Sequence, residues 1–321
     1  MDHRAADLST AKSAAPNRPA TPAQMQESDS LTIFAISLIP MPNQINGTEP
    51  ILCAHLLRQV DAKLLELLRG LREDEWDLRT VAPAWNVRDV VSHLLDTALR
   101  KMSMVRDASF VEQPNISSEQ DVINLVNRLN REGVAVYRRL SVPVLSAMMD
   151  WACTQSAEFH ESLDPFAPAL FNVSWAGEDA SLNWFDTARE LTERWHHQQQ
   201  IREATARPGI MTPELYHPVL DCFLRGLPHA FRFVEAARGT TVRIDIQGDC
   251  GGTWILIRSV SGWSFSKSAQ VDLAAHVAIP QEIAWRVFTK GISRSEAIAR
   301  STLHGESMLT DQVFHLTAIV G

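Results

Sequence analysis

Apolar residues recur at helical spacing over most of the chain between residues 49 and 237. In the first run, residues 49–72, Leu56, Leu57, Val60 and Leu64 fall on one face of a helix. The same pattern, with Pro and Gly at the breaks, predicts a bundle of further helices over residues 86–107, 118–140, 144–160, 183–205 and 213–237.

The pattern changes near residue 240. Val242, Ile244 and Ile246 alternate with polar residues, which predicts a strand over 240–247. The sequence is therefore that of an α+β protein, with a helical bundle over residues 49–237 and a small α+β domain over 238–321. In this second domain we expect further strands over 254–258, 263–267 and 271–279, and helices over 281–290, 294–301 and 311–319.

Residues 1–48 form a separate N-terminal segment. Residues 1–30 are rich in Ala, Ser, Pro and Gln, which predicts a disordered extension. The apolar run Leu31–Pro40 is too short to cross a bilayer, and acidic rather than basic residues precede it, unlike in a signal peptide. Met41 is an alternative start residue.

Composition narrows the class of partner. The hydrophobic fraction of 45% and the charged fraction of 21% are typical of a soluble globular protein. The net charge of −8 disfavours nucleic acid and anionic membranes as partners. The four cysteines are scattered without a C-x-x-C pair, which suits a reducing compartment. We expect a cytoplasmic protein, monomeric or homodimeric, that binds neither nucleic acid nor membranes.

The helix predicted over residues 183–205 carries side chains that can bind a metal. Glu193 and His197 are four residues apart, so they lie on one face of that helix. His93 lies among apolar residues of the helix predicted over 86–107. If the two helices pack together, these three ligands leave one coordination position open, as in a catalytic zinc site.

Spacing alone leaves other interpretations open. Glu190 could replace Glu193, and His196 is a rival to His197 because its spacing from Glu193 also suits a helix face. A Glu/His pair at this spacing is also common on solvated helices. A single histidine among apolar residues is often a core residue.

A longer motif resembles that of a known family. An acidic-Trp pair, Glu75-Trp76, precedes the run Pro83-Ala84-Trp85-Asn86-Val87-Arg88-Asp89-Val90-Val91-Ser92-His93-Leu94. This resembles the N-terminal signature of the mycothiol-dependent maleylpyruvate isomerase family, where Ser or Thr stands in place of Asn86. The resemblance covers most of residues 50–320. It implies a DinB-like, up-down four-helix bundle followed by a sterol-carrier-like α+β domain.

The resemblance also implies a site and a chemistry. His93, Glu193 and His197 would bind Zn²⁺ or another divalent metal. A low-molecular-weight thiol would be the cosubstrate, and its thiolate would add to a small electrophilic or unsaturated acid. The activity would be that of a thiol-dependent cis-trans isomerase or a thiol S-transferase. A non-catalytic metal-containing protein that binds a ligand or acts in a stress response is the alternative.

The region expected to hold the anionic substrate departs from the family pattern. Family members commonly have an arginine after a glycine at the end of a helix, whereas this chain reads Lys290-Gly291 there. Lys290 is the first candidate catalytic-site cation and Arg286 the second. At Lys290 the two-pronged geometry with which arginine binds a carboxylate would be missing.

Overall fold

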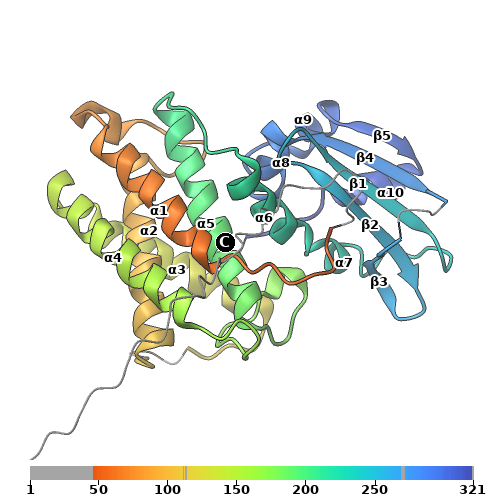
Figure 1. Cartoon of the computed structure of the whole chain (residues 1–321), viewed down its shortest axis with the longest axis horizontal. Coiled ribbons are helices and arrows are strands. Elements are labelled where there is room, and N and C mark those ends of the chain that lie inside the picture. Colours follow the sequence, from red (N-terminus) through yellow and green to blue (C-terminus); the bar gives the residue numbers. More distant parts are fainter. Residues whose placement is uncertain (1–45, 111, 113, 269–271, 320–321) are drawn as a thin grey trace, which may run out of the picture. The chain divides into compact units, whose positions relative to one another are not determined.

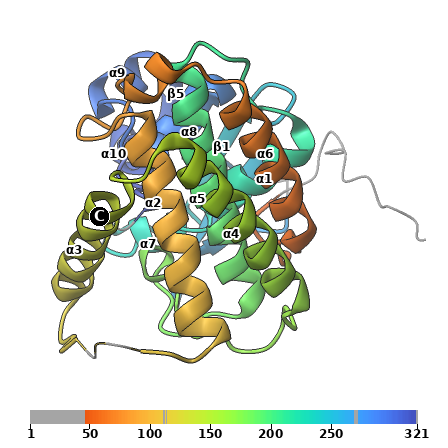
Figure 2. The ribbon, with the colours of Figure 1, turned by 90° about the vertical axis from the view of Figure 1, so that its left-hand side faces the viewer.

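Four long helices of the N-terminal half pack around one another (Figure 1). Helix α1 contacts α4 and α5, and α2 contacts the same two helices, so α1 and α2 lie diagonally across the bundle. Helix α3 packs against α2 at the margin of this group (Figure 2). The bounds are α1 (Ala54–Arg69), α2 (Val87–Lys101), α3 (Glu119–Tyr137), α4 (Val142–Ser162) and α5 (Asn183–Ala204).

This is a computed structural model, and it describes residues 46–110, 112, 114–268 and 272–319. The described residues all belong to one compact unit, to which all that follows applies. The disordered extension predicted over residues 1–48 lies outside the described residues except for its last three, and the apolar run and Met41 lie wholly outside them. Within the described residues, no helix is both long and apolar enough to span a membrane.

Local sequence explains where the bundle helices begin. The Asn86 side chain accepts a hydrogen bond from the Asp89 amide at 2.9 Å, and the Asp89 carboxylate accepts one from the Asn86 amide at 3.3 Å. This reciprocal pair caps α2. Ser118 caps α3 in a similar way, and Pro143 occupies the first turn of α4. The helix predicted over residues 86–107 is α2 followed by a π-helical turn, Met102–Arg106.

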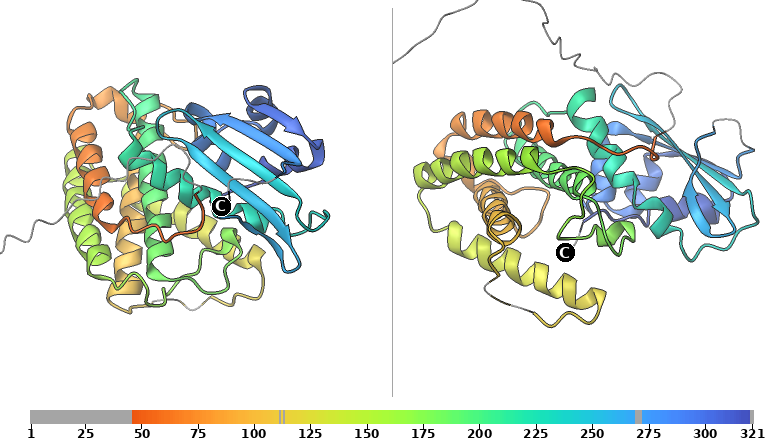
Figure 3. Two further views of the ribbon diagram at one scale, coloured as in Figure 1. Left: turned by 45° about the vertical axis from the view of Figure 1, so that its right-hand side comes forward. Right: turned by 60° about the horizontal axis from the view of Figure 1, so that its bottom comes forward.

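The C-terminal half is built on one five-stranded sheet in the order β3-β2-β1-β4-β5 (Figure 3). Strands β1 and β4 are parallel and the other neighbours antiparallel. Ile244 pairs with Trp254 on one side and Val277 on the other, and all three are fully buried. The strands are β1 (Thr241–Gln247), β2 (Gly252–Ser259), β3 (Gly262–Phe265), β4 (Ala275–Pro280) and β5 (Thr302–Gly305).

Shorter helices accompany the sheet, and α6 among them packs against α5 of the bundle. They are α6 (Pro213–Leu224), α7 (Leu227–Ala230), α8 (Gln281–Phe288), α9 (Arg294–Ala299) and α10 (Ser307–Val313). Trp195 of α5 stacks on Tyr216 of α6 with ring centroids 4.2 Å apart. The Tyr216 hydroxyl accepts a hydrogen bond from the Trp285 amide of α8 at 3.1 Å. One apolar cluster thus runs from α5 and α6 into the sheet. It crosses the domain boundary expected at residue 237, which stays a prediction.

The α+β class, with helices first and a mixed sheet after them, is confirmed, but three details of the C-terminal half were wrong. The helix expected over 213–237, in which Pro218 and Pro228 predict kinks or breaks, is interrupted between Leu224 and Leu227, just before Pro228, but it ends at Ala230. Strand β5 was not predicted, because its position depends on pairing with β4 rather than on its own pattern. The last helix covers Ser307–Val313 instead of 311–319. Phe314, Leu316 and Ala318 are buried at alternate positions after it, a spacing of two rather than of a helix.

A buried arginine joins three helices of the bundle. From α5, the Arg194 guanidinium donates to Asp61 of α1, to the Ser156 hydroxyl of α4 at 2.6 Å, and to Glu190 at 3.2 Å. Arg194 and the two carboxylates are almost fully buried. Charges in such an environment are tolerated only when they are paired.

Replacing this arginine should therefore destabilise the bundle. In Arg194→Met, Asp61 loses its cation in a low-dielectric interior, and we expect the free energy of unfolding to fall by about 3–5 kcal/mol. Urea denaturation followed by circular dichroism measures the change. The double variant Asp61→Leu/Arg194→Met, which leaves no lone aspartate, should recover part of the loss. Unchanged stability in Arg194→Met would contradict this account.

Candidate metal centre

Helices α2 and α5 bring three metal-ligating side chains together. One ligand atom from each of His93, Glu193 and His197 lies within 4.8 Å of the other two. The two imidazole rings meet edge-on, with centroids 4.7 Å apart. Glu193 Oε2 lies 3.5 Å from His197 Nε2. The three residues selected from the sequence are therefore neighbours in the structure.

The donor set and its spacing fit a divalent metal. Two atoms bound to one tetrahedral zinc at about 2.0–2.2 Å lie about 3.3–3.6 Å apart, which matches the 3.5 Å between Glu193 Oε2 and His197 Nε2. The Nδ1 atom of His93 is buried and has no hydrogen-bond partner among the described residues. An orphaned buried nitrogen costs free energy. A metal ion between the three side chains would supply a partner that the protein lacks.

A hydrogen bond fixes the ring of His197. Its Nδ1 lies 2.9 Å from Gln200 Oε1. The amide oxygen can only accept, so Nδ1 carries the proton and the Nε2 lone pair faces Glu193. Such a partner on the far nitrogen is typical of metal-binding histidines. The sequence analysis missed Gln200; its spacing of three residues from His197 on the same helix was the available signal.

The structure separates the two alternatives that spacing left open. Glu190 accepts from Arg194 at 3.2 Å and pairs with Lys101 at 3.5 Å, so its carboxylate is committed to cations. His196 lies beside His197 with ring centroids 3.9 Å apart, but its Nδ1 bonds to the Thr192 carbonyl at 2.8 Å. Neither residue belongs to the group of converging ligand atoms in the described part of the chain.

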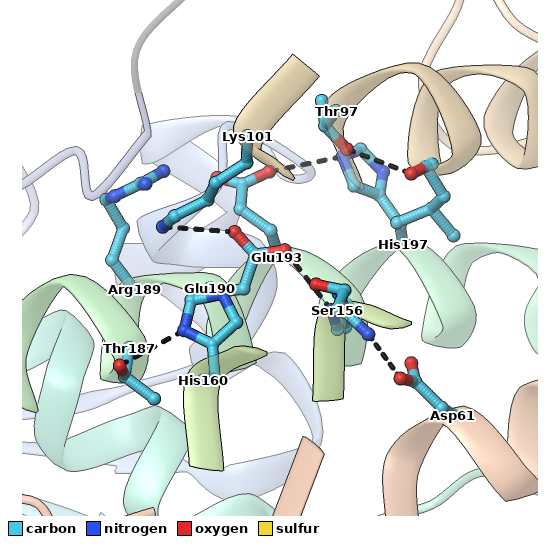
Figure 4. Close-up of polar contacts among 12 residues, drawn as sticks. Asp61, Thr97, Lys101, Ser156, His160, Thr187, Arg189, Glu190, Glu193 and His197 are labelled. Carbon is cyan, nitrogen blue, oxygen red and sulfur yellow. Dashed lines mark hydrogen bonds and ion pairs between the residues drawn. The ribbon is translucent and has the colours of Figure 1, made fainter. Parts of the chain in front are cut away.

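An ionic network lies next to Glu193 and His197 (Figure 4). Lys101 of α2 reaches across to Asp186 of α5 at 2.8 Å and to Glu190 at 3.5 Å. Arg189 pairs with Asp186. With the Arg194–Asp61 pair, the network and Glu193 hold three cations and four carboxylates. The site therefore has one excess negative charge, which favours a cation.

The protonation states suit metal binding. Burial raises the pKa of Glu193, but its contact with His197 and nearby cationic groups outweigh burial and lower that pKa to about 2. Burial and the neighbouring His197 hold the pKa of His93 well below its usual range. At neutral pH the site thus offers an ionised carboxylate and a neutral His93 imidazole, the forms that bind metals.

The two predicted substrate-binding cations have other partners. Arg286 pairs with Glu203 at 2.5 Å and lies over the Trp285 ring. Lys290 lines a cavity of about 300 Å³ that His229, Arg232 and His315 also line. Among the described contacts, none joins Arg286 or Lys290 to the three ligands. Their role in catalysis stays a prediction.

One tryptophan covers the ligands. The Trp85 ring lies 4.7 Å from the His93 ring and 6.0 Å from the His197 ring, measured between centroids. Trp85 precedes α2 and is half-buried. It therefore forms one wall of the site.

Comparisons with known proteins support the same family. Residues 57–202 match the family model described as the mycothiol maleylpyruvate isomerase N-terminal domain. Over this segment the chain is similar to that domain. The matched range contains His93, Glu193 and His197, whereas Arg286, Lys290 and the sheet lie beyond it.

Solved structures of the mycothiol-dependent maleylpyruvate isomerase are also similar to this chain. One, of a mutant, is 12% identical with a TM-score of 0.48, and the match covers 79% of this chain and 92% of that one. Another is 12% identical with a TM-score of 0.45, and the match covers 73% of this chain and 86% of that one. No curated protein sequence matches the chain.

The first prediction from this candidate site concerns metal content. The purified protein should hold about one equivalent of zinc or another divalent metal, and His93→Ala or His197→Ala should lose most of it because two ligands bind far more weakly than three. Plasma mass spectrometry measures the metal. The exposed His315 offers a matched control, since His315→Ala should keep the metal. Gln200→Leu should weaken binding by about 10–100-fold. Full occupancy in both ligand variants would refute the assignment.

A second prediction concerns stability in acid. Burial and nearby Lys101 lower the pKa of His160 to about 3, while an unfolded histidine has a pKa of about 6.5. Between these values the unfolded chain binds the proton and the folded chain does not. The free energy of unfolding therefore falls as the pH falls through this window.

A glutamine at this position tests the contribution. His160→Gln can still hydrogen-bond Thr187, which lies 3.2 Å from His160 Nδ1, but it cannot take up the proton. We expect the free energy of unfolding of this variant to fall less steeply as the pH falls. Its slope should be smaller than that of the wild type by about 1.4 kcal/mol per pH unit. Urea denaturation at several pH values between 6 and 4 measures both slopes. Equal slopes would show that His160 is not buried as a neutral ring.

Proposed function

We propose that this chain is a metal-dependent enzyme that uses a low-molecular-weight thiol to isomerise a small unsaturated acid or to transfer the thiol to it. The observation that carries the proposal is the convergence of His93, Glu193 and His197 within a segment similar to the mycothiol maleylpyruvate isomerase N-terminal domain. Two imidazoles and one carboxylate leave a coordination position open, which is typical of catalytic rather than structural zinc.

The thiol must come from outside the chain. Burial raises the pKa of Cys53 to about 12 and that of Cys250 to about 11. Burial also holds the pKa values of Cys153 and Cys222 well above their usual range. All four cysteines are buried, so none offers a reactive thiolate near neutral pH. A cosubstrate thiol is therefore the nucleophile that fits this protein.

The protein residues prepare the site for that thiol. A divalent metal, when bound, supplies the positive charge that keeps a thiol ionised near neutral pH. Gln200 holds His197 in the tautomer whose Nε2 faces Glu193. Trp85 packs against both histidine rings and keeps water from that side. Glu193 is 24% exposed, so its carboxylate is partly accessible to solvent.

The isomerisation balances without further cofactors. The thiolate sulfur forms a bond to one carbon of the activated cis double bond, and the π electron pair moves to the conjugated carbonyl oxygen. Rotation about the new single bond follows. The electron pair then returns, the carbon–sulfur bond breaks, and the same thiolate leaves the trans product. If the adduct takes up a proton instead, the outcome is thiol transfer.

The alternative is a metal-containing protein that binds a ligand or acts in a stress response without turnover. The pairing of the other carboxylates favours it, because Asp186 and Glu190 are both committed to Lys101. No further group near the ligands then stands out as an acid or a base in the described residues. The isomerisation needs neither, so this observation does not exclude the enzyme.

A thiol panel tests the proposal. Zinc-loaded protein is mixed with mycothiol, bacillithiol or glutathione and with maleylpyruvate, and the conversion to the trans acid is followed by absorbance and chromatography. We expect turnover with at least one thiol, none without thiol, and a loss of at least about 100-fold in His93→Ala, because the thiolate is no longer held. The matched control is again His315→Ala. Ligand binding without turnover across the whole panel would favour the alternative.

A further inference from the structure

Arg189 lies one helical turn before Glu193 on α5. Residues four apart on a helix share a face, and Figure 4 shows both side chains rising from α5 on the same side. Each of the two side chains is 24% exposed. In contrast, Lys101 and Glu190 beside them are only 7% exposed. Of the three cations of the network, Arg189 is therefore the most exposed.

The guanidinium of Arg189 is only partly used by the protein. Its Nε and Nη2 both donate to a single oxygen, Oδ1 of Asp186, at 3.2 and 2.8 Å. The other oxygen of Asp186 is held by Lys101 at 2.8 Å. No described contact involves Nη1 of Arg189. A guanidinium binds a carboxylate best through two parallel N–H···O bonds, and Asp186 does not engage Arg189 in that way.

The net charge around Arg189 favours the binding of one anion. The network and Glu193 carry three cations and four carboxylates. A bound divalent metal changes the excess from one negative to one positive charge. Uncompensated charge in a partly buried site is unfavourable. In the metal-loaded site without thiol, one anionic group beside Arg189 would neutralise this excess.

We propose that Arg189 binds a carboxylate of the substrate, next to the metal ligands. The proposal rests on the proposed function, and it names the group that holds the acid. It also differs from the sequence-based candidates. Arg286 already pairs with Glu203, and Lys290 lines a different cavity. Unlike Lys290, Arg189 offers the planar fork that recognises a carboxylate.

Maleate, a small cis-dicarboxylate, is the probe for this test. Isothermal titration calorimetry measures its binding to the full-length zinc-loaded protein without thiol, and the neutral diamide of maleic acid serves as the uncharged comparison. We expect maleate to bind and the diamide not to bind. Arg189→Gln should weaken maleate binding by at least about tenfold, the loss of one charge-assisted contact. The surface variant Arg128→Gln is the matched control.

A second variant gives an effect in the opposite direction. In Asp186→Asn the internal partner of Arg189 loses its charge, so the guanidinium becomes more available and maleate should bind more tightly. A merely structural role for Arg189 predicts no tightening. Removing zinc with a chelator should weaken binding, because the site returns to a negative excess. Should Arg189→Gln fail to fold, Asp186→Asn/Arg189→Gln removes the pair together and should show the same loss of binding.

Several results would overturn the proposal. The first is that the zinc-loaded wild type does not bind maleate detectably. The second is that a folded Arg189→Gln variant binds maleate with unchanged affinity. The third is that Lys290→Gln loses affinity for maleate while Arg189→Gln does not. Failure of the proposed function looks different, because it is the absence of thiol-dependent turnover. If maleate binding depends on Arg189 but no turnover occurs, the carboxylate site is supported and the proposed enzymatic activity is refuted.

Discussion

Helix α5 carries a charged face into the interior of a helical bundle, and the rest of the site depends on how that charge is balanced. Asp186, Glu190 and Arg194 lie at successive turns of this helix and are almost fully buried. Buried charges are stable only when each has a partner. Lys101 from α2 and Asp61 from α1 supply such partners. The packing of α1 and α2 against α5 therefore depends on the neutralisation of the buried charges of α5.

The same constraint explains the position of the candidate metal site. After the ion pairs are formed, Glu193 is the carboxylate without a cationic side chain of its own, and His197 and His93 face it. Both neighbours are imidazoles, and burial holds His93 in its neutral form. A divalent cation would balance this arrangement. Gln200 completes it by fixing the His197 ring.

Much of this could be predicted from the sequence, because it depends on local periodicity. The four-residue spacing put Glu193 and His197 on one face, and the apolar neighbours of His93 put it on a buried one. Which of Glu193 and Glu190 is the candidate metal ligand could not be predicted from local spacing. It depends on Lys101, which lies on another helix. The role of Gln200 depends on a side-chain rotamer, which spacing does not determine.

The most direct measurement of the central claim is X-ray absorption at the zinc edge, with and without a small thiol. The account predicts a first shell of nitrogen and oxygen ligands in the zinc-loaded protein, and one sulfur ligand at about 2.3 Å once the thiol is added. The His93→Ala protein should not show the same shell. A first shell that the thiol leaves unchanged, or one that already contains cysteine sulfur before thiol is added, would contradict the account.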